Sequence, residues 1–272
     1  MNEKPVLAVI GGSGLYQFED LKEIETLELE TPFGTPSSPI TIGKLNGKRV
    51  AFLARHGIGH VLSPSEVPYR ANIYALKSLG VSRIVSVSAC GSLREAYAPG
   101  HIIIPHQIFD FTHKRQRSVF FKGLVAHVSV ADPFCESLSD ILEESLKELD
   151  ATYHRGGVYI TIEGPRFSTK CESGLYRQWG MDIIGMTASP EIFLAREAEI
   201  CYTTMAHVTD YDVWHVSEET VTVDMVVRTL LKNVRIAQET IKKLVDKIDP
   251  SGHCQCEDAL KDALITQPAH ID

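Results

Sequence analysis

The sequence predicts a single α/β domain in which helices flank a central mixed β-sheet. Apolar runs of strand length alternate with segments of helical periodicity along the chain. No Pro/Ser-rich linker or change in composition divides the 272 residues, and no internal repeat is visible. A chain of this length can form one large domain. We therefore expect one domain over residues 1–249 and a polar, loosely held tail over residues 250–272.

The predicted strands are short and apolar, and several end in small or polar residues. Asn46-Gly47 joins two of them and is a strong signal for a type I′ hairpin turn. Residues 152–167 are expected to be extended, and residues 181–187 to form a short strand. The other expected strands cover residues 5–10, the two halves of 38–57, 81–93, 101–111 and 199–212.

The predicted helices lie between these strands. Residues 63–80 contain a helix that closes at Gly80, and residues 169–180 form another. Asp132-Pro133 has the pattern of a helix start and predicts a helix to about Leu149. Ser189-Pro190-Glu191 opens the next one. From Thr222 a long amphipathic helix is predicted by apolar residues at helical spacing: Val223, Val226, Val227, Leu230, Leu231, Val234, Ala237, Ile241, Leu244 and Val245.

Composition excludes several functional classes. The formal charge of −8 argues against a surface for nucleic acid or acidic membrane, which needs a basic excess. No apolar run approaches the roughly 20 residues of a membrane span. The N-terminal segment lacks the basic region and cleavage site of a signal peptide, so we expect a cytoplasmic protein.

The six cysteines show no CxxC pair of the kind that holds zinc, and no metal site is expected. Cys90, Cys135, Cys171 and Cys201 are interpreted as packed thiols. Cys254 and Cys256 lie in the polar tail, where a disulfide or redox pair is an open alternative. Whether Cys135 and Cys201 pair is equally open.

The segment GGSGL (11–15) follows the first strand and allows close approach to an oxyanion. Glycines free the backbone N–H groups, and Ser13 adds a hydroxyl. A dinucleotide fingerprint is excluded because Gln17 stands where its last glycine would be, and no Walker lysine follows. A plain tight turn is the alternative.

The segments ARHGIGH (54–60) and SVSACGSL (86–93) also close strands with polar residues. Arg55 offers a fork of donors suited to phosphate, although a surface arginine is equally compatible. His56 and His60 have the spacing of a helical metal pair, but the intervening glycines make a helix there improbable. Ser88 and Ala89 precede Cys90, which is interpreted as a packed thiol rather than a nucleophile.

Two further stretches contribute residues to the candidate site. Phe167 and Ser168 follow a Gly-Pro turn, where an aromatic ring could stack on a planar ligand or simply join the core. Met186 and Thr187 precede a helix whose first N–H groups favour an anion.

The segment TDYDVW (209–214) ends the last strand with a pair of acids. If the chain stays extended, Asp210 and Asp212 point to one side and Tyr211 to the other, where it would pack. Since open α/β sheets bind ligands at strand ends, the combination suggests a site for an anion and a planar base.

The motifs GGSGL, ARHG.GH, SACGSLRE, TIEGPRFST..ES, GMT..PE..LARE..ICY and TDYDVW occur in order between residues 6 and 245. Together they resemble the methylthioadenosine phosphorylases of the trimeric purine nucleoside phosphorylase family. The Cys-x-Cys tail is similar to the ending of some archaeal members.

The resemblance implies a purine nucleoside phosphorylase-like fold and phosphorolysis of 5′-methylthioadenosine, with inorganic phosphate as co-substrate and no cofactor. It also implies a homotrimer or homohexamer.

The resemblance implies a role for each candidate site residue. The residues that would bind phosphate are Ser13, Arg55, His56, Ser88, Ala89 and Thr187. Met186 would contact the ribose, and the base would be bound by Phe167, Ser168, Asp210 and Asp212. The 5′ pocket would be formed by Val223, Val227, His60 and His127 of a neighbouring subunit. Family members often carry threonine in place of Ser13 and Ser88, and serine keeps the hydroxyl.

The residue types fit that chemistry. Phosphate would attack an oxocarbenium-like sugar, and Asp210 would act as the general acid at N7 of the leaving adenine. Burial beside Asp212 would keep that acid protonated. Relatives that prefer 6-oxopurines carry asparagine in place of Asp210, so its carboxyl indicates a 6-amino base. Two rivals remain, a noncatalytic nucleoside sensor and a nucleosidase that uses water; an oxidoreductase is excluded by Gln17.

Overall fold

The computed structural model describes residues 3–12, 15, 18, 20–118, 123–215 and 223–271, without the side chains of residues 224–233 and 268. Within this part the strands form one mixed sheet. The strands are ordered β2(Lys22–Leu27), β3(Ile40–Leu45), β4(Lys48–Ala54), β1(Leu7–Gly11), β5(Arg83–Ser92), β10(Ile183–Gly185), β9(Val158–Ile162) and β7(Gln107–Phe111). Off this path, β11(Cys201–Asp210) pairs with β5 and β6(Ile102–Ile104), and β6 pairs with β8(Tyr153–Arg155).

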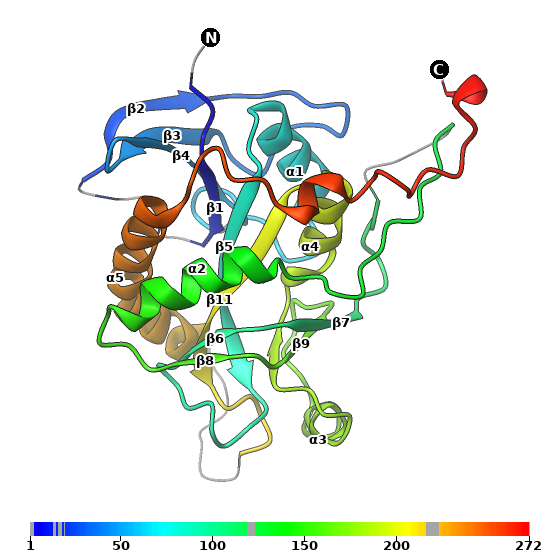
Figure 1. The fold of residues 1–272 in the computed structure, drawn as a ribbon. Coiled ribbons are helices and arrows are strands. Elements are labelled where there is room, and N and C mark those ends of the chain that lie inside the picture. Colours follow the sequence, from blue (N-terminus) through cyan, green and yellow to red (C-terminus); the bar gives the residue numbers. More distant parts are fainter. Residues whose placement is uncertain are drawn as a thin grey trace.

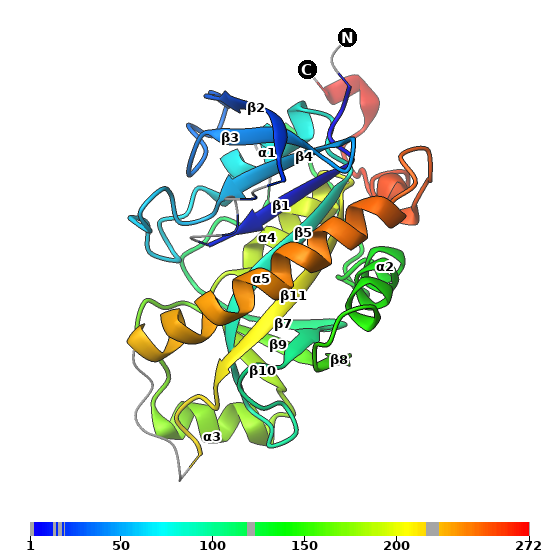
Figure 2. The same ribbon diagram turned by 90° about the vertical axis from the view of Figure 1, so that its left-hand side faces the viewer.

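Helices cover both faces of this sheet (Figures 1 and 2). Helices α2(Glu136–Lys147) and α5(Val223–Lys247) pack on one face, and α1(Tyr69–Ser78) and α4(Ala188–Glu197) on the other. Helix α3(Lys170–Gln178) lies at the lower end of the molecule in Figure 1. Short 3₁₀ turns, η1(Gln255–Asp258) and η2(Pro268–His270), follow in the tail. The predicted α/β fold class is confirmed.

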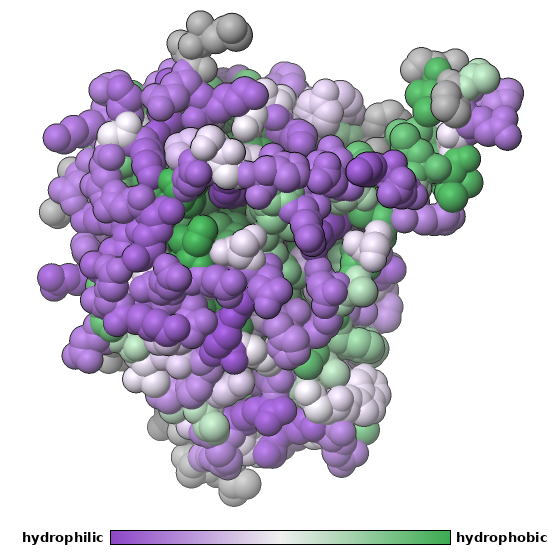
Figure 3. All heavy atoms as spheres, viewed as in Figure 1, coloured by the Kyte–Doolittle hydropathy of each residue, from purple (hydrophilic) through white to green (hydrophobic). Residues whose placement is uncertain are grey.

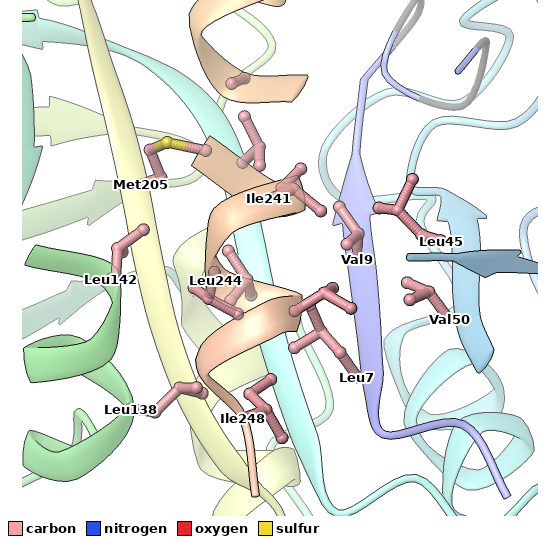
Figure 4. Close-up of a cluster of buried hydrophobic side chains, with 14 of the residues drawn as sticks. Leu7, Val9, Leu45, Val50, Leu138, Leu142, Met205, Ile241, Leu244 and Ile248 are labelled. Carbon is pink, nitrogen blue, oxygen red and sulfur yellow. The ribbon is translucent and has the colours of Figure 1, made fainter. Parts of the chain in front are cut away.

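Alternation along the central strands divides the core into two layers. Successive residues of β1 point to opposite faces, so Leu7 and Val9 join the cluster under α2 and α5, whereas Ala8 and Ile10 join the cluster under α1 and α4. Figure 4 shows the first cluster, in which α5 lies against β1 and α2 packs beside β11. Its labelled members are Leu7, Val9, Leu45, Val50, Leu138, Leu142, Met205, Ile241, Leu244 and Ile248.

The hairpin and long-helix predictions are confirmed. Asn46 and Gly47 both have positive φ, +50° and +81°, as a type I′ turn requires. Helix α5 begins at Val223, one residue after the expected start. None of the helices in the described ranges is at once long enough and apolar enough to span a membrane.

Two predicted elements differ in extent. Helix α2 begins at Glu136 rather than at Asp132, because Cys135 takes the N-cap position and its Sγ accepts from the Leu138 N–H. The single strand expected over 101–111 is two strands, β6 and β7, which pair with different neighbours. They are separated at Pro105, which has no backbone N–H and so cannot donate a hydrogen bond to a neighbouring strand.

The expectation of a loosely held tail is wrong for its first part. Arg83 donates to the carbonyl of Gly252, and Cys256 is buried in the core cluster. Further on, Leu264 forms an isolated bridge with Ala126, and the His127 N–H donates to the carbonyl of Ala263. The tail is therefore packed against residues 125–127 of the main domain.

Packing of α5 on the sheet predicts the stability of one variant pair. Ile241 is fully buried between α5 and the sheet, whereas Arg235 on the same helix is exposed. Ile241→Ala should lower the free energy of unfolding by about 2–5 kcal/mol, because it leaves a cavity in the core. Arg235→Ala should change it by less than about 0.5 kcal/mol. Denaturant unfolding at one fixed protein concentration measures both, and equal midpoints would contradict this packing.

Candidate active site

The candidate site lies where the central strand β5 changes partners. On one edge, β5 pairs in parallel with β1 as far as Ser86, and antiparallel with β10 from Gly91 onward. On the other edge, β11 pairs with β5 along its whole length to Gly91. Among the described residues, the stretch between Ser86 and Gly91 therefore has no strand partner on the first edge. Such a switch point is where open α/β sheets hold their ligands.

The carboxyl ends of β1 and β4 meet this opening. Gly11 of β1 pairs with Ala54 of β4, and the Arg55 N–H donates to the carbonyl of Gly11 at 3.0 Å. Continued by two residues, the β1–β5 register sets Gly12 level with Ser88. Ser13 itself lies outside the described residues. Gly11, Arg55 and Ser88 thus lie at the same end of the sheet, as the strand-end argument predicted.

The two acids lie at the far end of the same opening. Asp210 pairs with Gly91, and a Cβ added to Gly91 would lie 3.0 Å from Asp210 Oδ1 and 3.3 Å from the Cβ of Asp212. Both acids are buried, with 8% and 6% of their surface exposed. Asp210 Oδ2 accepts from Thr209 Oγ1 at 2.7 Å.

The reason given for this convergence was wrong. Strand β11 ends at Asp210, and Asp212 has a φ of +52°, so the pair is not extended. A turn brings the acids together instead, because the Asp212 N–H donates to Asp210 Oδ1 at 2.8 Å. Burial raises the pKa of Asp212, although a contact from Ser173 opposes the shift, and the neighbouring Asp210 adds to it. Tyr211 packs its ring on His215, with centroids 4.6 Å apart.

The length of this opening can be taken from the strand itself. Ser88 and Gly91 are three residues apart on β5, and a strand rises about 3.3 Å per residue, so their levels differ by roughly 10 Å. One end offers hydroxyl and backbone donors, and the other offers two buried carboxyl groups. The site can therefore span a small ligand that has an anion at one end and a hydrogen-bonding ring at the other.

Arg55 is held differently from the sequence expectation. Its guanidinium is buried and makes a bidentate pair with Glu191, with Nε and Nη2 each 2.8 Å from a carboxylate oxygen. Nη2 also donates to Ser86 Oγ at 2.7 Å, and Tyr202 donates to the same carboxylate. Burial lowers the pKa of Arg55, but the charge of Glu191 outweighs it and leaves the pKa raised.

The fork of Arg55 is therefore mostly occupied by protein. Among the described residues, Nη1 has one acceptor, the carbonyl of Val87 at 3.3 Å. Glu191 was not identified from the sequence as the partner, because 136 residues separate it from Arg55 and neither residue's local context signals the other.

The two histidines contact each other rather than forming a helical metal pair. The rings of His56 and His60 stack with centroids 4.2 Å apart, and His60 has a φ of +58°. His56 Nδ1 lies 2.9 Å from the carbonyl of Leu62. Burial, together with the charge of Arg55, lowers the pKa of His56 to about 4, so the ring is neutral at pH 7. Its Nδ1–H then donates to Leu62, and its Nε2 is an acceptor.

Ser88 faces residues that follow β10. The antiparallel register pairs Ile184 with Gly91, and its continuation sets Met186 opposite Ala89 and Thr187 opposite Ser88. Thr187 is buried at the N-cap of α4. The Ser88 hydroxyl is buried and makes no hydrogen bond of normal geometry, although the hydroxyl of Tyr159 lies nearby.

Arg115 fixes the loop that carries Met186, and it was not identified from the sequence. Its Nη1 donates to the carbonyls of Met186 and Ser189, both at 2.6 Å, and Nη2 donates to that of Glu163 at 2.7 Å. The guanidinium thus joins the segment after β9 to the segment after β10. Such long-range contacts to backbone carbonyls leave no motif in the sequence.

The remaining predicted residues are those assigned to the base and to the 5′ pocket. Phe167 is 37% exposed, and the buried Ser168 hydroxyl has no partner among the described residues. Val223 is exposed at the start of α5, and the side chain of Val227 lies outside the description. His127 is exposed and lies beside the tail with Phe134 and Cys256. That location is near the beginning of β11, so His127 is at the opposite end of the strand from Asp210.

Comparison with known proteins adds an independent result. Residues 6–248 match the family model described as "Phosphorylase superfamily". The chain is 52% identical over 267 residues to an S-methyl-5′-thioadenosine phosphorylase of Geobacter sulfurreducens, covering 98% of this chain and 93% of the relative. It is 53% identical over 266 residues to the protein of that name from Chloroflexus aurantiacus, covering 97% and 92%.

Solved structures agree with these relatives. A methylthioadenosine phosphorylase from an antarctic soil metagenomic library superposes with a TM-score of 0.94 at 49% identity, covering 99% of this chain and 96% of that one. A methylthioadenosine phosphorylase from Schistosoma mansoni in complex with adenine superposes with a TM-score of 0.88 at 37% identity, covering 95% and 96%.

The buried ion pair predicts a large effect of one conservative substitution. Glu191→Gln removes the charge that compensates Arg55 and should lower the free energy of unfolding by about 3–5 kcal/mol, because a buried guanidinium is left unpaired. As a control, Lys44→Gln breaks a partly exposed pair with Glu23 and should cost less than about 1 kcal/mol. Denaturant unfolding of both variants measures the difference. A similar, small loss in both would show that Glu191 does not balance Arg55.

Proposed function

This chain belongs to the phosphorylase superfamily, and from that membership we propose that it catalyses phosphorolysis of 5′-methylthioadenosine by inorganic phosphate. The products are adenine and 5-methylthioribose 1-phosphate. The enzyme is a pentosyltransferase, since it moves a pentosyl group from a base to phosphate. Its near-full-length relatives carry the name of this activity, and structural neighbours are described with adenine, tubercidin or methylthioadenosine.

The observation that carries the proposal for the site is the opening along β5. Its anion-binding end at Ser88 and its acidic end at Gly91 lie roughly 10 Å apart, about the length of a phosphate, a ribose and the near edge of a purine. Phosphate at one end would then face the anomeric carbon from the side opposite the base. That is the arrangement a displacement at this carbon needs.

At the anion end, neutral donors do most of the binding. We assign phosphate to Ser13, Arg55, His56, Ser88, Ala89 and Thr187. The buried Ser88 hydroxyl gains a partner there, which removes a desolvation cost of about 1–3 kcal/mol. Thr187 adds its hydroxyl at the turn that leads into α4, where Ser189 is still non-helical. Neutral His56 contributes an acceptor at Nε2, which suits the one protonated oxygen of hydrogen phosphate.

At the base end, Asp210 serves as the general acid. As the C1′–N9 bond breaks, its electron pair moves into the purine, and the proton of Asp210 goes to N7. Phosphate oxygen forms the new bond to C1′. The backbone N–H of Asp212 donates to Asp210 Oδ1, which keeps the two acids in contact. The pKa of the Asp212 carboxyl is raised, chiefly by burial, as expected in a pocket that disfavours a second negative charge. The two carboxyl groups are best treated as one coupled pair.

Recognition of the base and the 5′ group follows from the neighbouring side chains. An acceptor oxygen of Asp210 can bind the 6-amino group of adenine, while Phe167 and Ser168 line the base and Met186 lies against the ribose. Val223, Val227 and His60 are assigned to the 5′ pocket. An apolar pocket of this kind should prefer the methylthio group to a hydroxyl by about 1–3 kcal/mol, so adenosine would be the poorer substrate.

We further propose that the enzyme works as a homotrimer or homohexamer in the cytoplasm, with no cofactor besides phosphate. Within one chain, His127 lies at the opposite end of β11 from Asp210, so it can reach a 5′ pocket only in another copy. Figure 3 shows apolar residues gathered on the segment that projects at the upper right. Exposed side chains of this segment and its neighbour, Val125, Leu264 and Ile265, offer an apolar contact for that copy.

The decisive experiment for the function is release of adenine from methylthioadenosine with and without phosphate. The proposal expects release only when phosphate is present, with one methylthioribose 1-phosphate formed per adenine. Equal release in phosphate-free buffer would identify a nucleosidase instead. Saturable binding of the nucleoside without any release would identify a sensor.

Asp210→Asn tests the acid directly. This variant should lower kcat for methylthioadenosine by about 10²–10⁴-fold, because an amide cannot deliver a proton to N7. The KM for phosphate should stay near its original value, since phosphate binds at the other end of the opening. Asp140→Asn, an exposed acid on α2, serves as the matched control and should retain full turnover. Near-normal kcat in Asp210→Asn would remove Asp210 from its assigned role.

A further inference from the structure

Four cysteines from three separate parts of the chain meet at the opposite end of the sheet from the active site. Cys135 caps α2, Cys201 begins β11, and Cys254 and Cys256 belong to the tail. Their Sγ atoms all lie within 4.8 Å of one another. The Sγ atoms of Cys135 and Cys254 are 3.6 Å apart, and all four residues are free thiols. This grouping is hereafter the thiol cluster.

The surroundings of the thiol cluster suit thiolate ligands. Cys135, Cys201 and Cys256 are buried, with 3%, 1% and 5% of their surface exposed. Several donors point at the sulfur atoms. The Leu138 N–H donates to Cys135 Sγ at 3.4 Å, Ser137 Oγ lies 3.3 Å from Cys254 Sγ, and Arg196 Nη1 donates to Cys256 Sγ at 3.5 Å.

We propose that the thiol cluster is a structural Zn²⁺ site in which Cys135, Cys201, Cys254 and Cys256 are the four ligands. Tetrahedral coordination with Zn–S bonds of about 2.3 Å places the sulfur atoms roughly 3.8 Å apart. The 3.6 Å between the Sγ atoms of Cys135 and Cys254 is close to that value and well above the roughly 2.05 Å of a disulfide bond, and the four Sγ atoms all lie within 4.8 Å of one another. An all-thiolate, closed set of four ligands favours zinc over magnesium, calcium or manganese.

Metal binding would change the charge of the thiol cluster. Without a cation the group cannot ionise completely, because the sulfur atoms repel one another's charge. Binding Zn²⁺ releases four protons to solvent and leaves a complex of charge −2, which Arg196 and the first N–H groups of α2 partly balance.

The sequence has no CxxC pair, and for that reason no metal site was expected. Two of the ligands proposed here are single cysteines that the fold brings to the thiol cluster, so the absence of CxxC pairs does not exclude the site. A route for the ion also exists, since Cys135, Cys254 and Cys256 line a surface pocket of about 800 Å³ together with Arg196 and His127.

A metal at the thiol cluster would fix the tail to the domain. Cys254 and Cys256 precede Ala263 and Leu264, which hold residues 126 and 127 through the His127 N–H and an isolated bridge. The site would therefore position His127 for the neighbouring copy. This consequence, but not the metal site itself, rests on the function proposed above.

Metal content of the full-length wild-type protein is the primary test. Protein purified without chelators, or reduced and incubated with Zn²⁺ before desalting, should hold about one Zn²⁺ per chain by inductively coupled plasma mass spectrometry. Replacement by Co²⁺ should give the intense visible bands of tetrahedral cobalt thiolate. The double variant Cys254→Ser/Cys256→Ser should retain less than about a tenth of the metal. Cys171→Ser, which changes an exposed cysteine outside the thiol cluster, should retain all of it.

The outcomes separate this site from the alternatives and from the catalytic proposal. Fewer than about 0.1 Zn²⁺ per chain after incubation, with no cobalt bands, would overturn the site. So would intact-mass measurement of disulfides among these four cysteines in the freshly purified protein, or equal metal in the double variant and in Cys171→Ser. Since the wild-type cobalt spectrum needs no variant and no substrate, neither a folding defect nor a failed activity assay can mask the result.

Discussion

The structure depends on one constraint, which is that β5 is longer than the strand beside it. With ten residues, β5 outruns β1, and its free edge is taken up again by β10 only at Gly91. Because β11 follows β5 along the other edge, the intervening stretch is rigid although one side is open. A ligand can therefore meet backbone groups and short side chains that are held in place by a complete ladder behind them.

The basic side chains at this opening carry little uncompensated positive charge. Arg55 is neutralised by Glu191, and His56 is held neutral by burial and by Arg55 itself. Phosphate would then be bound by a net field that is only weakly positive, which is compatible with release of a phosphorylated product. The guanidinium contributes mainly by fixing the ends of β4, β5 and α4 relative to one another. A strongly basic pocket would bind phosphate more tightly but would also retain the sugar phosphate.

The features that could be predicted from the sequence are those determined by residues close together in the chain. Asn46-Gly47 specifies its turn locally, and the small residues after each apolar run mark the strand ends that line the site. The location of Asp210 was predictable, but the turn that orients Asp212 was not, because it depends on a hydrogen bond that forms only once the strand stops. The pairing of Glu191 with Arg55 depends on tertiary structure and has no local signal.

The two ends of the sheet differ in the groups that they bring together. At the carboxyl ends of the parallel strands, the buried hydroxyls of Ser88 and Ser168 have no hydrogen-bond partner among the described residues, and a ligand could supply one. At the beginning of β11, Cys201, the cap of α2 and the tail converge on the thiol cluster, where a metal would supply the missing stability. Since His127 is attached to this end of one chain, the metal would also set how closely the next copy can complete its pocket.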